Sequence, residues 1–237
     1  MEVRLLTYNA HGCVGTDGVR DPARIALVIA EARADVVALQ ELDVGRRRSA
    51  RVDQAAEIAA RLEMQHHFAA AREIDDGHYG NAIVSRWPLR LVRAGALPGL
   101  PRRETRGALW AALSLPTGDT LQVITTHLGL RARERRAQVA ALIGEEWLAG
   151  FTPPGVLCGD LNSPPWSSEC KRFGDCLRRA RSPGWRPDGT FPAWLPLLPI
   201  DHVFATPDVE VLRVEPWATP LARRASDHLP LAVTLRV

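Results

Sequence analysis

The chain has 237 residues and a mass of 26.0 kDa, enough for one large domain with a substantial core, and we expect residues 1–237 to form one domain. Hydrophobic residues make up 46% and charged residues 24%, a balance that excludes an intrinsically disordered chain. The formal net charge of +3 permits a polyanionic partner without requiring one. No apolar run is long enough to cross a membrane, so we expect no stable membrane insertion.

The start of the chain and the cysteines bear on its cellular location. Residues 1–9 contain no basic segment followed by an apolar core, so we expect no secretory signal and a cytoplasmic location. Four scattered cysteines form neither a disulfide framework nor a zinc cluster. Cys158 lies within an apolar run and is expected to be a small core residue. We expect the protein to be a monomer.

Strands and helices alternate in the first half of the chain, and hairpins dominate elsewhere. Apolar positions at helical spacing predict three helices, at 22–33 with Asp21 as N-cap, at 54–62, and at 132–148. Short β-rich runs predict strands at 3–8, 35–41, 80–85, 156–159, 200–204 and 231–237, and a hairpin of 108–115 with 121–126. This mixture indicates an α/β or α+β fold with a largely buried sheet core.

Polar side chains occur repeatedly where these strands stop. A rigid sheet can bring side chains from distant segments to one mouth, and ligand sites gather at strand ends for that reason. Each such residue taken alone is also an ordinary turn or surface residue. The residues in question are Asn9, Glu41, His127, Asp160 with Asn162, Asp201 with His202, and Asp227 with His228.

The chemistry of this set is that of oxygen ligands and imidazoles. The sequence has no nucleophile elbow, phosphate-binding glycine loop, dinucleotide fingerprint or two-histidine helix motif. Carboxylate and amide oxygens favour Mg²⁺ or Mn²⁺, which keep waters and substrate phosphate in their shells. Histidines beside carboxylates suit acid/base work near neutral pH. The set therefore indicates metal-assisted hydrolysis of a phosphate ester.

Seven short motifs occur in one order along the chain, from residue 7 to residue 230. They are TYN at 7–9, QE at 40–41, YGNAIVSR at 79–86, THLG at 126–129, GDLN at 159–162, IDHVF at 200–204 and SDHLP at 226–230. In this set the sequence closely resembles the endonuclease/exonuclease/phosphatase superfamily. The resemblance implies a four-layer α/β/β/α sandwich of two mixed β-sheets flanked by helices, with the site at one edge.

The resemblance also implies roles for individual residues. Glu41 is expected to be the principal ligand of Mg²⁺ or Mn²⁺, with Asn9 and Asp227 helping to hold the ion or its waters. Asp160 is expected to orient or deprotonate the attacking water, or to protonate the leaving oxygen. Asn162 is expected to donate to the phosphoryl oxygens.

The histidines have separate implied roles. His228 is expected to stabilise the phosphoryl group and to be oriented by Asp201, and His127 to assist the leaving group. His127 is typical of the deoxyribonuclease and sphingomyelinase branches of the superfamily. Asn81 is expected to bind phosphate or to hold His127, and its alternative is an amide that satisfies the backbone.

Other polar residues keep two interpretations. Arg106, with Thr105, is expected to line the substrate cleft, since a guanidinium suits phosphate, and a solvated basic loop is the alternative. His202 is expected to be a packed or hydrogen-bonded residue. The remaining histidines, His11, His66, His67 and His78, are expected on the surface or in loops.

The substrate is less sharply predicted than the chemistry. A nuclease acting on nucleic acid is the first hypothesis, a phosphodiesterase or phosphatase for lipid or small phosphates the second, and a non-catalytic binding module the third. Aromatic residues near the site could stack on a base, touch a lipid or pack the rim: Trp166, Trp185, Phe191 and Trp194. A basic stretch after His127 could contact flanking phosphates or be a solvated helix face: Arg131, Arg133, Arg135 and Arg136.

Overall fold

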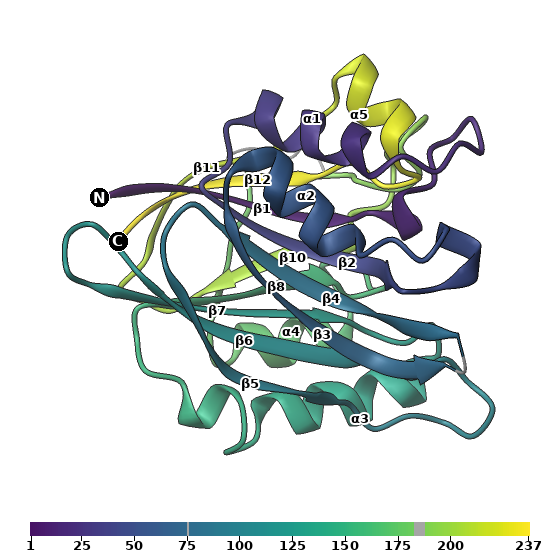
Figure 1. Ribbon diagram of the computed structural model, residues 1–237. Helices are drawn as coiled ribbons and strands as arrows, with labels where there is room; N and C mark the ends of the chain where they lie inside the picture. Colours follow the sequence, from purple (N-terminus) through teal and green to yellow (C-terminus); the bar gives the residue numbers. More distant parts are fainter. Residues whose placement is uncertain (75, 183–187) are drawn as a thin grey trace.

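The computed structural model describes residues 1–74, 76–182 and 188–237, and Trp185 lies outside them. Two six-stranded sheets pack face to face, and helices cover their outer faces (Figure 1). The predicted four-layer α/β/β/α sandwich is confirmed. The two chain termini lie together at the left-hand end in Figure 1, opposite the right-hand end at which β1 and β2 finish.

The first sheet has the strand order β11-β12-β1-β2-β4-β3. Its strands are β1 (Glu2–Asn9), β2 (Val36–Val44), β3 (Gln65–Ile74), β4 (Gly77–Ser85), β11 (Glu210–Pro216) and β12 (Leu231–Arg236). β1 runs parallel to β2 and antiparallel to β12, so the sheet is mixed. The parallel pair carries Asn9 and Gln40 side by side at its end.

The second sheet repeats this plan with the order β5-β6-β7-β8-β10-β9. Its strands are β5 (Leu89–Ala96), β6 (Gly107–Ser114), β7 (Thr120–His127), β8 (Gly155–Asp160), β9 (Arg178–Arg179) and β10 (Asp201–Ala205). β7 runs parallel to β8, and the other pairs are antiparallel. The β6–β7 hairpin and the strands β8, β10 and β12 confirm the sequence prediction.

The helices lie on the two outer faces. On the first sheet lie α1 (Pro22–Ala32), α2 (Gln54–Leu62) and α5 (Pro220–Ala225), and on the second α3 (Ala132–Ile143) and α4 (Ser168–Gly174) (Figure 1). The carboxylates of Asp21 and Asp53 accept backbone N–H bonds in the first turns of α1 and α2, which fixes where these helices begin. None of the helices in the described residues is both long and apolar enough to traverse a bilayer.

Strict alternation along the strands builds three hydrophobic layers. On β1, Leu5 faces the second sheet, and Leu6 faces the helices α1 and α2. On β8, Val156 packs between the sheets while Leu157 packs against α3 and α4 with Phe173. The inner layer between the sheets is therefore purely apolar along most of its length, and it changes character only where the strands end.

Several expected boundaries are wrong. The helix expected over 132–148 ends at Ile143, because Gly144 adopts an extended conformation and a separate short turn follows at Leu148–Gly150. The strand expected over 35–41 continues to Val44. The histidines His66 and His67 lie on β3, a strand that the sequence pattern did not predict.

Candidate active site

Strand alternation places five polar side chains on the inner faces of the two sheets, at the end of the sandwich where β1 and β2 finish. We call this end the mouth of the site. Alternate positions further along the same strands fill the apolar inner layer, such as Leu5 on β1, Val156 on β8 and Val203 on β10. The inner row of β1 thus ends in Asn9, and that of β7 in His127. The others are Gln40 on β2, Asp160 on β8 and Asp201 on β10. All five of these side chains are buried.

Glu41 reaches the same mouth through a β-bulge. Leu39 pairs with Ala82 and Leu42 with Gly80, so two residues of β2 face the single residue Asn81 of β4. Glu41 takes the left-handed conformation with φ 61°, which turns its carboxylate toward Asn9. The expectation that β2 stops at Glu41 is wrong, but the residue still arrives at the site. In a regular strand Glu41 would point to the face opposite that of Gln40, and the extra residue of the bulge turns its side chain toward the site.

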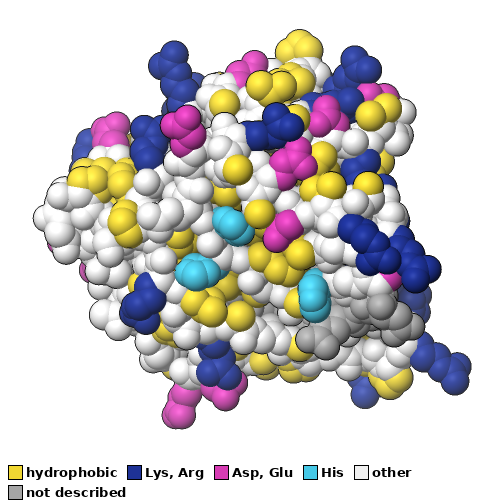
Figure 2. Space-filling view, in the orientation of Figure 1, with side chains coloured by type: hydrophobic (Ala, Val, Ile, Leu, Met, Phe, Trp, Pro, Cys, Tyr) yellow, Lys and Arg dark blue, Asp and Glu magenta, His cyan; other side chains and the backbone are white. Residues whose placement is uncertain are grey.

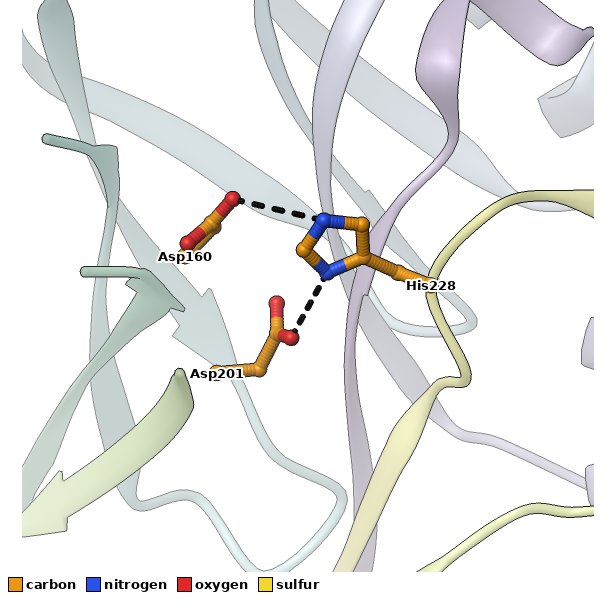
Figure 3. Close-up of side chains that lie close together, drawn as sticks. All are labelled: Asp160, Asp201 and His228. Atoms are coloured by element: carbon orange, nitrogen blue, oxygen red, sulfur yellow. Dashed lines mark hydrogen bonds and ion pairs between the residues drawn. The ribbon is translucent and has the colours of Figure 1, made fainter. Parts of the chain in front are cut away.

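Asp160 and Asp201 face each other across the antiparallel pair β8–β10, and His228 joins them from the loop before β12 (Figure 3). His228 Nδ1 lies 2.8 Å from Asp201 Oδ2, and its Nε2 lies 3.7 Å from Asp160 Oδ2. The Thr190 hydroxyl donates to the same Asp201 oxygen at 2.6 Å. His228 is thus held between two buried carboxylates.

The position of His228 between two carboxylates favours the protonated, positively charged form of its imidazole. Burial alone would lower the pKa of His228, but the carboxylates, Asp201 foremost and then Asp160 and Asp227, raise it to about 10. The imidazolium in turn acts on Asp160. Burial raises the pKa of Asp160 above its usual range, with Asp201 adding to the effect, while His228 and the Asn162 backbone N–H oppose it.

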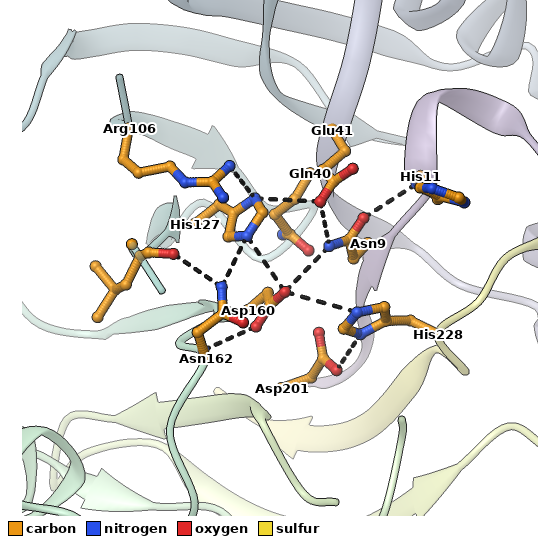
Figure 4. A network of polar contacts seen from close by, with 12 residues as sticks. Asn9, His11, Gln40, Glu41, Arg106, His127, Asp160, Asn162, Asp201 and His228 are labelled. Atoms are coloured by element: carbon orange, nitrogen blue, oxygen red, sulfur yellow. Dashed lines mark hydrogen bonds and ion pairs between the residues drawn. The ribbon is translucent and has the colours of Figure 1, made fainter. Parts of the chain in front are cut away.

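Asn9 connects this pair to Glu41 (Figure 4). Its amide nitrogen lies 3.0 Å from Glu41 Oε1 and 3.1 Å from Asp160 Oδ2, and its oxygen accepts the backbone N–H of His11 at 3.0 Å. Both ends of the amide are therefore occupied. Asn9 fixes the spacing between a partly exposed carboxylate and a buried one.

His127 approaches Asp160 from the opposite flank, beside Arg106 (Figure 4). Arg106 NH1 lies 3.0 Å from His127 Nδ1, and because a guanidinium can only donate, Nδ1 accepts. A neutral imidazole then carries its proton on Nε2, which lies 3.3 Å from Asp160 Oδ2. Burial, with Arg106 and His228 contributing, lowers the pKa of His127 well below its usual range. His127 is the neutral histidine of the site.

Arg106 is buried, with 6% of its surface exposed, so the alternative of a solvated basic loop is wrong for this residue. Asn162 follows Asp160 in a left-handed conformation with φ 49°. Its backbone N–H donates to Asp160 Oδ1 at 2.8 Å, and its amide donates to Leu128 O at 2.9 Å while lying 3.0 Å from His127 Nε2. Asn162 therefore orients Asp160 and lies beside His127.

Asp227 lies at the outer rim of the mouth. Its Oδ1 is 3.7 Å from His11 Nδ1, and 39% of its side chain is exposed. Ser226 beside it donates to the Asn9 carbonyl at 2.8 Å and so ties the loop before β12 to β1. Glu41 and Asp227 are the two accessible carboxylates of the mouth, at 21% and 39% of side-chain exposure.

The site offers two sets of oxygen-rich ligands for a metal ion. Asp160, Asp201 and His228 present ligand atoms that all lie within 4.8 Å of one another, and Asp201 Oδ1 is buried without a hydrogen-bond partner in the described residues. Glu41 with Asn9 and Asp227 forms the second, more accessible set. Both sets match the oxygen preference of Mg²⁺ and Mn²⁺.

Two predicted residues lie deeper than the mouth. The Asn81 amide is buried and donates to the Gly107 carbonyl at 2.9 Å, which is the backbone-satisfying alternative for this residue. His202 is buried and contacts the Ser163 carbonyl through Nε2 at 2.8 Å, as expected for a packed histidine. Burial lowers the pKa of His202 to about 4.

Sequence reasoning missed two contributors: Thr190 holds Asp201, and His11 links Asn9 with Asp227. Phe191, which was expected near the site, packs on the His228 ring with centroids 4.8 Å apart. Thr190 comes from an irregular segment in which no residue type or spacing signals the site. For His11, the signal was its position two residues after Asn9.

The aromatic residues of the rim differ in exposure. Trp166 is 79% exposed and Trp194 71% exposed, so rim packing does not account for these two. Phe191 is half-buried against His228. Of the basic residues after His127, Arg135 pairs with Glu169 at 3.2 Å and bonds the Leu130 carbonyl, which gives it a structural role.

Known proteins share this sequence pattern and fold. Residues 6–228 match the model of the Endonuclease/Exonuclease/phosphatase family. The uncharacterized protein YbhP of Escherichia coli (strain K12) is 31% identical over 174 residues, which cover 68% of this chain and 64% of YbhP. This chain therefore matches less than two thirds of the length of that relative.

Two solved structures share the fold of this chain. The mannosyl-6-phosphatase of Bacteroides thetaiotaomicron superposes with a TM-score of 0.78 at 19% identity, over 99% of this chain and 100% of that one. TDP2 of D. rerio, complexed with single strand DNA product, superposes with a TM-score of 0.72 at 19% identity, over 100% and 99% of the two chains. The family match covers nearly the whole chain, and the protein belongs to the Endonuclease/Exonuclease/phosphatase family.

Proposed function

We propose that this protein is a divalent-metal-dependent phosphodiester hydrolase that acts on nucleic acid. The observation that supports the chemistry best is the environment of one oxygen, Asp160 Oδ2. Groups from three other segments lie around it: Asn9 at 3.1 Å, His127 at 3.3 Å and His228 at 3.7 Å. A buried carboxylate with a raised pKa, between one charged and one neutral histidine, suits proton transfer near neutral pH.

Glu41 is the residue that we assign to the ion, with Asp227 and Asn9 beside it. Glu41 keeps 21% of its side chain exposed at the mouth, whereas Asp160 keeps 2%, so an ion from solvent can reach Glu41 first. The group Asp160, Asp201 and His228 is a weaker choice, because His228 is held protonated by its two carboxylates and a protonated imidazole cannot ligate. When bound, the ion supplies positive charge to the phosphoryl oxygens and lowers the pKa of a coordinated water.

The other side chains divide the remaining work. Asp160 takes the proton of the attacking water, and the His228 cation, held by Asp201, stabilises the charge that grows on the phosphoryl oxygens. His127 donates a hydrogen bond from Nε2 toward the leaving oxygen, and Asn162 supports both flanks. Arg106 sets the tautomer of His127. Asn81 acts through the Gly107 backbone, next to Arg106.

Nucleic acid is the proposed substrate because arginines line cavities on both sides of the mouth, and exposed tryptophans stand at its rim. The structure of TDP2 with single strand DNA product is in line with this choice. A lipid phosphodiester is the second candidate, favoured by exposed apolar side chains at the rim: Leu130, Trp166, Trp194 and Leu197. The mannosyl-6-phosphatase shares the fold and represents small-molecule substrates.

The test is a substrate panel assayed with Mg²⁺, with Mn²⁺ and with a chelator. The panel contains bis(4-nitrophenyl) phosphate, single-stranded DNA, supercoiled plasmid, sphingomyelin and sugar phosphates. We expect chelator-sensitive hydrolysis of the generic diester and of DNA. Hydrolysis of sphingomyelin or sugar phosphate instead of DNA would transfer the proposal to that substrate.

Variants separate catalysis from folding. Glu41→Gln is expected to lower kcat/KM for the generic diester by about 1,000-fold, because it removes the charge that holds the ion. Glu210→Gln is the matched control, since Glu210 is exposed on β11 and pairs only with Arg236 in the described residues. Wild-type protein that hydrolyses nothing in the panel, or a Glu41→Gln variant with full activity, would overturn the proposal.

A further inference from the structure

A cavity of about 440 Å³ opens beside Glu41. We call it the arginine cavity, and its argued lining residues are His11, Arg20, Glu41, Arg46, Arg48 and Tyr79. Glu41 belongs both to this cavity and to the mouth of the site, so the cavity borders the mouth. Figure 2 shows Lys and Arg side chains gathered at the right-hand end of the molecule, the end at which β1 and β2 finish.

Two of the arginines are ordered by one buried carboxylate. Asp43, whose side chain has no exposed surface, accepts two bonds from Arg48 at 2.7 and 2.8 Å and lies 3.8 Å from Arg46. The Arg48 guanidinium also stacks over the Tyr79 ring at 5.5 Å. Both guanidinium groups are thus fixed before any ligand arrives, which reduces the entropy that binding would cost.

Arg20 contributes the third guanidinium group of the arginine cavity. It donates to two backbone carbonyls, that of Gly12 at 3.1 Å and that of Arg48, and it forms no ion pair among residues 1–74, 76–182 and 188–237. Arg46 Nε also pairs with Asp76 Oδ1 at 3.4 Å, so among the described residues Arg20 is the cavity guanidinium that has no carboxylate partner. The other acids of the cavity have separate partners, since Glu104 pairs with Arg106 and Glu41 contacts Asn9.

The cavity walls are joined by a buried glutamine. The Gln54 amide donates to Gly12 O at 2.8 Å and accepts from the Asp43 backbone N–H at 2.8 Å. It thus ties the loop that carries His11 to the strand that carries Glu41 and to the Arg46–Arg48 turn. A rigid wall that presents the unpaired Arg20 guanidinium beside two ordered ones is suited to a compact, doubly charged oxyanion, which guanidinium forks bind in a bidentate manner.

We infer that the arginine cavity binds a second phosphate group of the substrate, adjacent to the one that is hydrolysed. This inference rests on the proposed function, because it places the reacting phosphoryl group between Glu41 and His228. A substrate with one phosphate would occupy the mouth alone. A substrate with a phosphate one sugar away would also engage Arg20, Arg46 and Arg48.

Two pairs of chromogenic substrates test the inference. One pair is thymidine 5′-(4-nitrophenyl phosphate) with and without a 3′-phosphate, and the other is thymidine 3′-(4-nitrophenyl phosphate) with and without a 5′-phosphate. Within each pair the scissile bond is the same. We expect the added phosphate to raise kcat/KM about tenfold in at least one pair, as two charge-assisted bonds would. The responsive pair identifies the side of the sugar that faces the cavity.

Variants locate the added phosphate. Arg20→Ala is expected to bring the kcat/KM ratio of the responsive pair to within about twofold of unity, and Arg20→Gln to do the same while keeping a hydrogen-bond donor. Arg131→Ala removes the same charge from a separate cavity of about 400 Å³ beyond Glu104, and it should keep the ratio. Loss of the ratio in Arg131→Ala but not in Arg20→Ala would overturn the inference, as would equal rates within both pairs in the wild type.

A binding measurement separates this inference from the proposed function. In the presence of EDTA, thymidine 3′,5′-bisphosphate should raise the Tm of the wild type and of Arg236→Ala, a remote charge control, but not that of Arg20→Ala. If the wild type hydrolyses no diester but shows this Arg20-dependent stabilisation, the proposed function fails and the anion site stands. If hydrolysis occurs without any Arg20-dependent ratio or stabilisation, the anion site fails and the proposed function stands.

Discussion

His228 and His127 approach the same oxygen of Asp160 from opposite flanks of the site. His228 stands between Asp201 and Asp160, which raise its pKa to about 10 against the effect of burial. His127 stands beside Arg106, and burial together with that guanidinium lowers its pKa well below the usual range. Of the two histidines in one mouth, His228 is thus charged at neutral pH and His127 is neutral. Their neighbours, rather than the imidazole itself, divide the work between a cation and a neutral hydrogen-bond donor.

Removing the charged histidine should have the largest effect. His228→Ala is expected to lower kcat about 1,000-fold with little change in fold, since it removes the cation that faces the phosphoryl oxygens. His67→Ala, on β3, is the matched control and should stay within about twofold of the wild type. Steady-state kinetics with bis(4-nitrophenyl) phosphate and a circular dichroism melt provide the measurement. A His228→Ala variant with wild-type kcat would remove the cationic flank from the mechanism.

Neutralising the partner of His228 should have the next largest effect. Asp201→Asn removes the carboxylate that contributes most to the raised pKa of His228, so this pKa is expected to fall. The alkaline limb of the pH–rate profile should then move to lower pH, and kcat at pH 8 should fall about 100-fold. The pH–rate profile, with the His228 ring signals followed by NMR, checks both. An unchanged alkaline limb would show that Asp201 does not set the charge of His228.

The environment of the neutral histidine, His127, can be changed by a substitution at Arg106 that leaves His127 itself in place. Arg106→Gln removes the guanidinium that helps to lower the pKa of His127, so this pKa is expected to rise, although burial keeps it below its usual range. Because more His127 is then charged in mild acid, the acid limb of kcat should move to higher pH, with a loss of at most about fourfold at pH 6. NMR titration of His127 decides the point. A pKa that stays in place would assign its depression to burial alone.

A third histidine provides the smallest effect and separates burial from charge. Among the described residues, the hydrogen-bond partners of His202 are the Ser163 carbonyl and Arg179, and burial lowers its pKa to about 4 from the ordinary 6.5. Its neutral form stabilises the fold fully above pH 6.5, and this contribution is lost as the pH falls from 6.5 toward 4. His202→Gln should flatten that part of the stability curve, by at most roughly 3 kcal/mol. Urea unfolding between pH 4 and pH 8 measures it, and parallel curves would contradict it.

The sequence predicted the longer elements with strong local signals, and it missed the weakly patterned strands and the short helices α4 and α5. The helices α1 and α2 begin where Asp21 and Asp53 cap them, and both were predicted. The strand β3 has a weak pattern, with two histidines and three alanines, and it forms because β4 lies beside it. β5 and β11 were missed for the same reason, since most of their side chains are not fully buried.

The same division holds within the site. Motif residues such as Asp160 and His228 were predicted because residue type and position suffice to mark them. The burial of Arg106 could not be predicted from a loop rich in arginine, because it depends on how β6 and β7 meet. The bulge at Glu41 was equally hidden, since it is defined by the register with β4. Their roles in catalysis remain predictions to be tested.

Each sheet supplies half of the reacting groups, and Gln40 lies between the halves. Its Nε2 is 3.2 Å from Thr7 Oγ1 in its own sheet and 3.0 Å from Thr125 Oγ1 in the other. A slight slide of one sheet over the other would separate Asn9 and Glu41 from Asp160 and His127 before any strand came apart. The rate of the proposed hydrolysis should therefore depend on how the two sheets are aligned. Substitutions at distant inner positions such as Leu109 should lower this rate at temperatures well below the Tm of the protein.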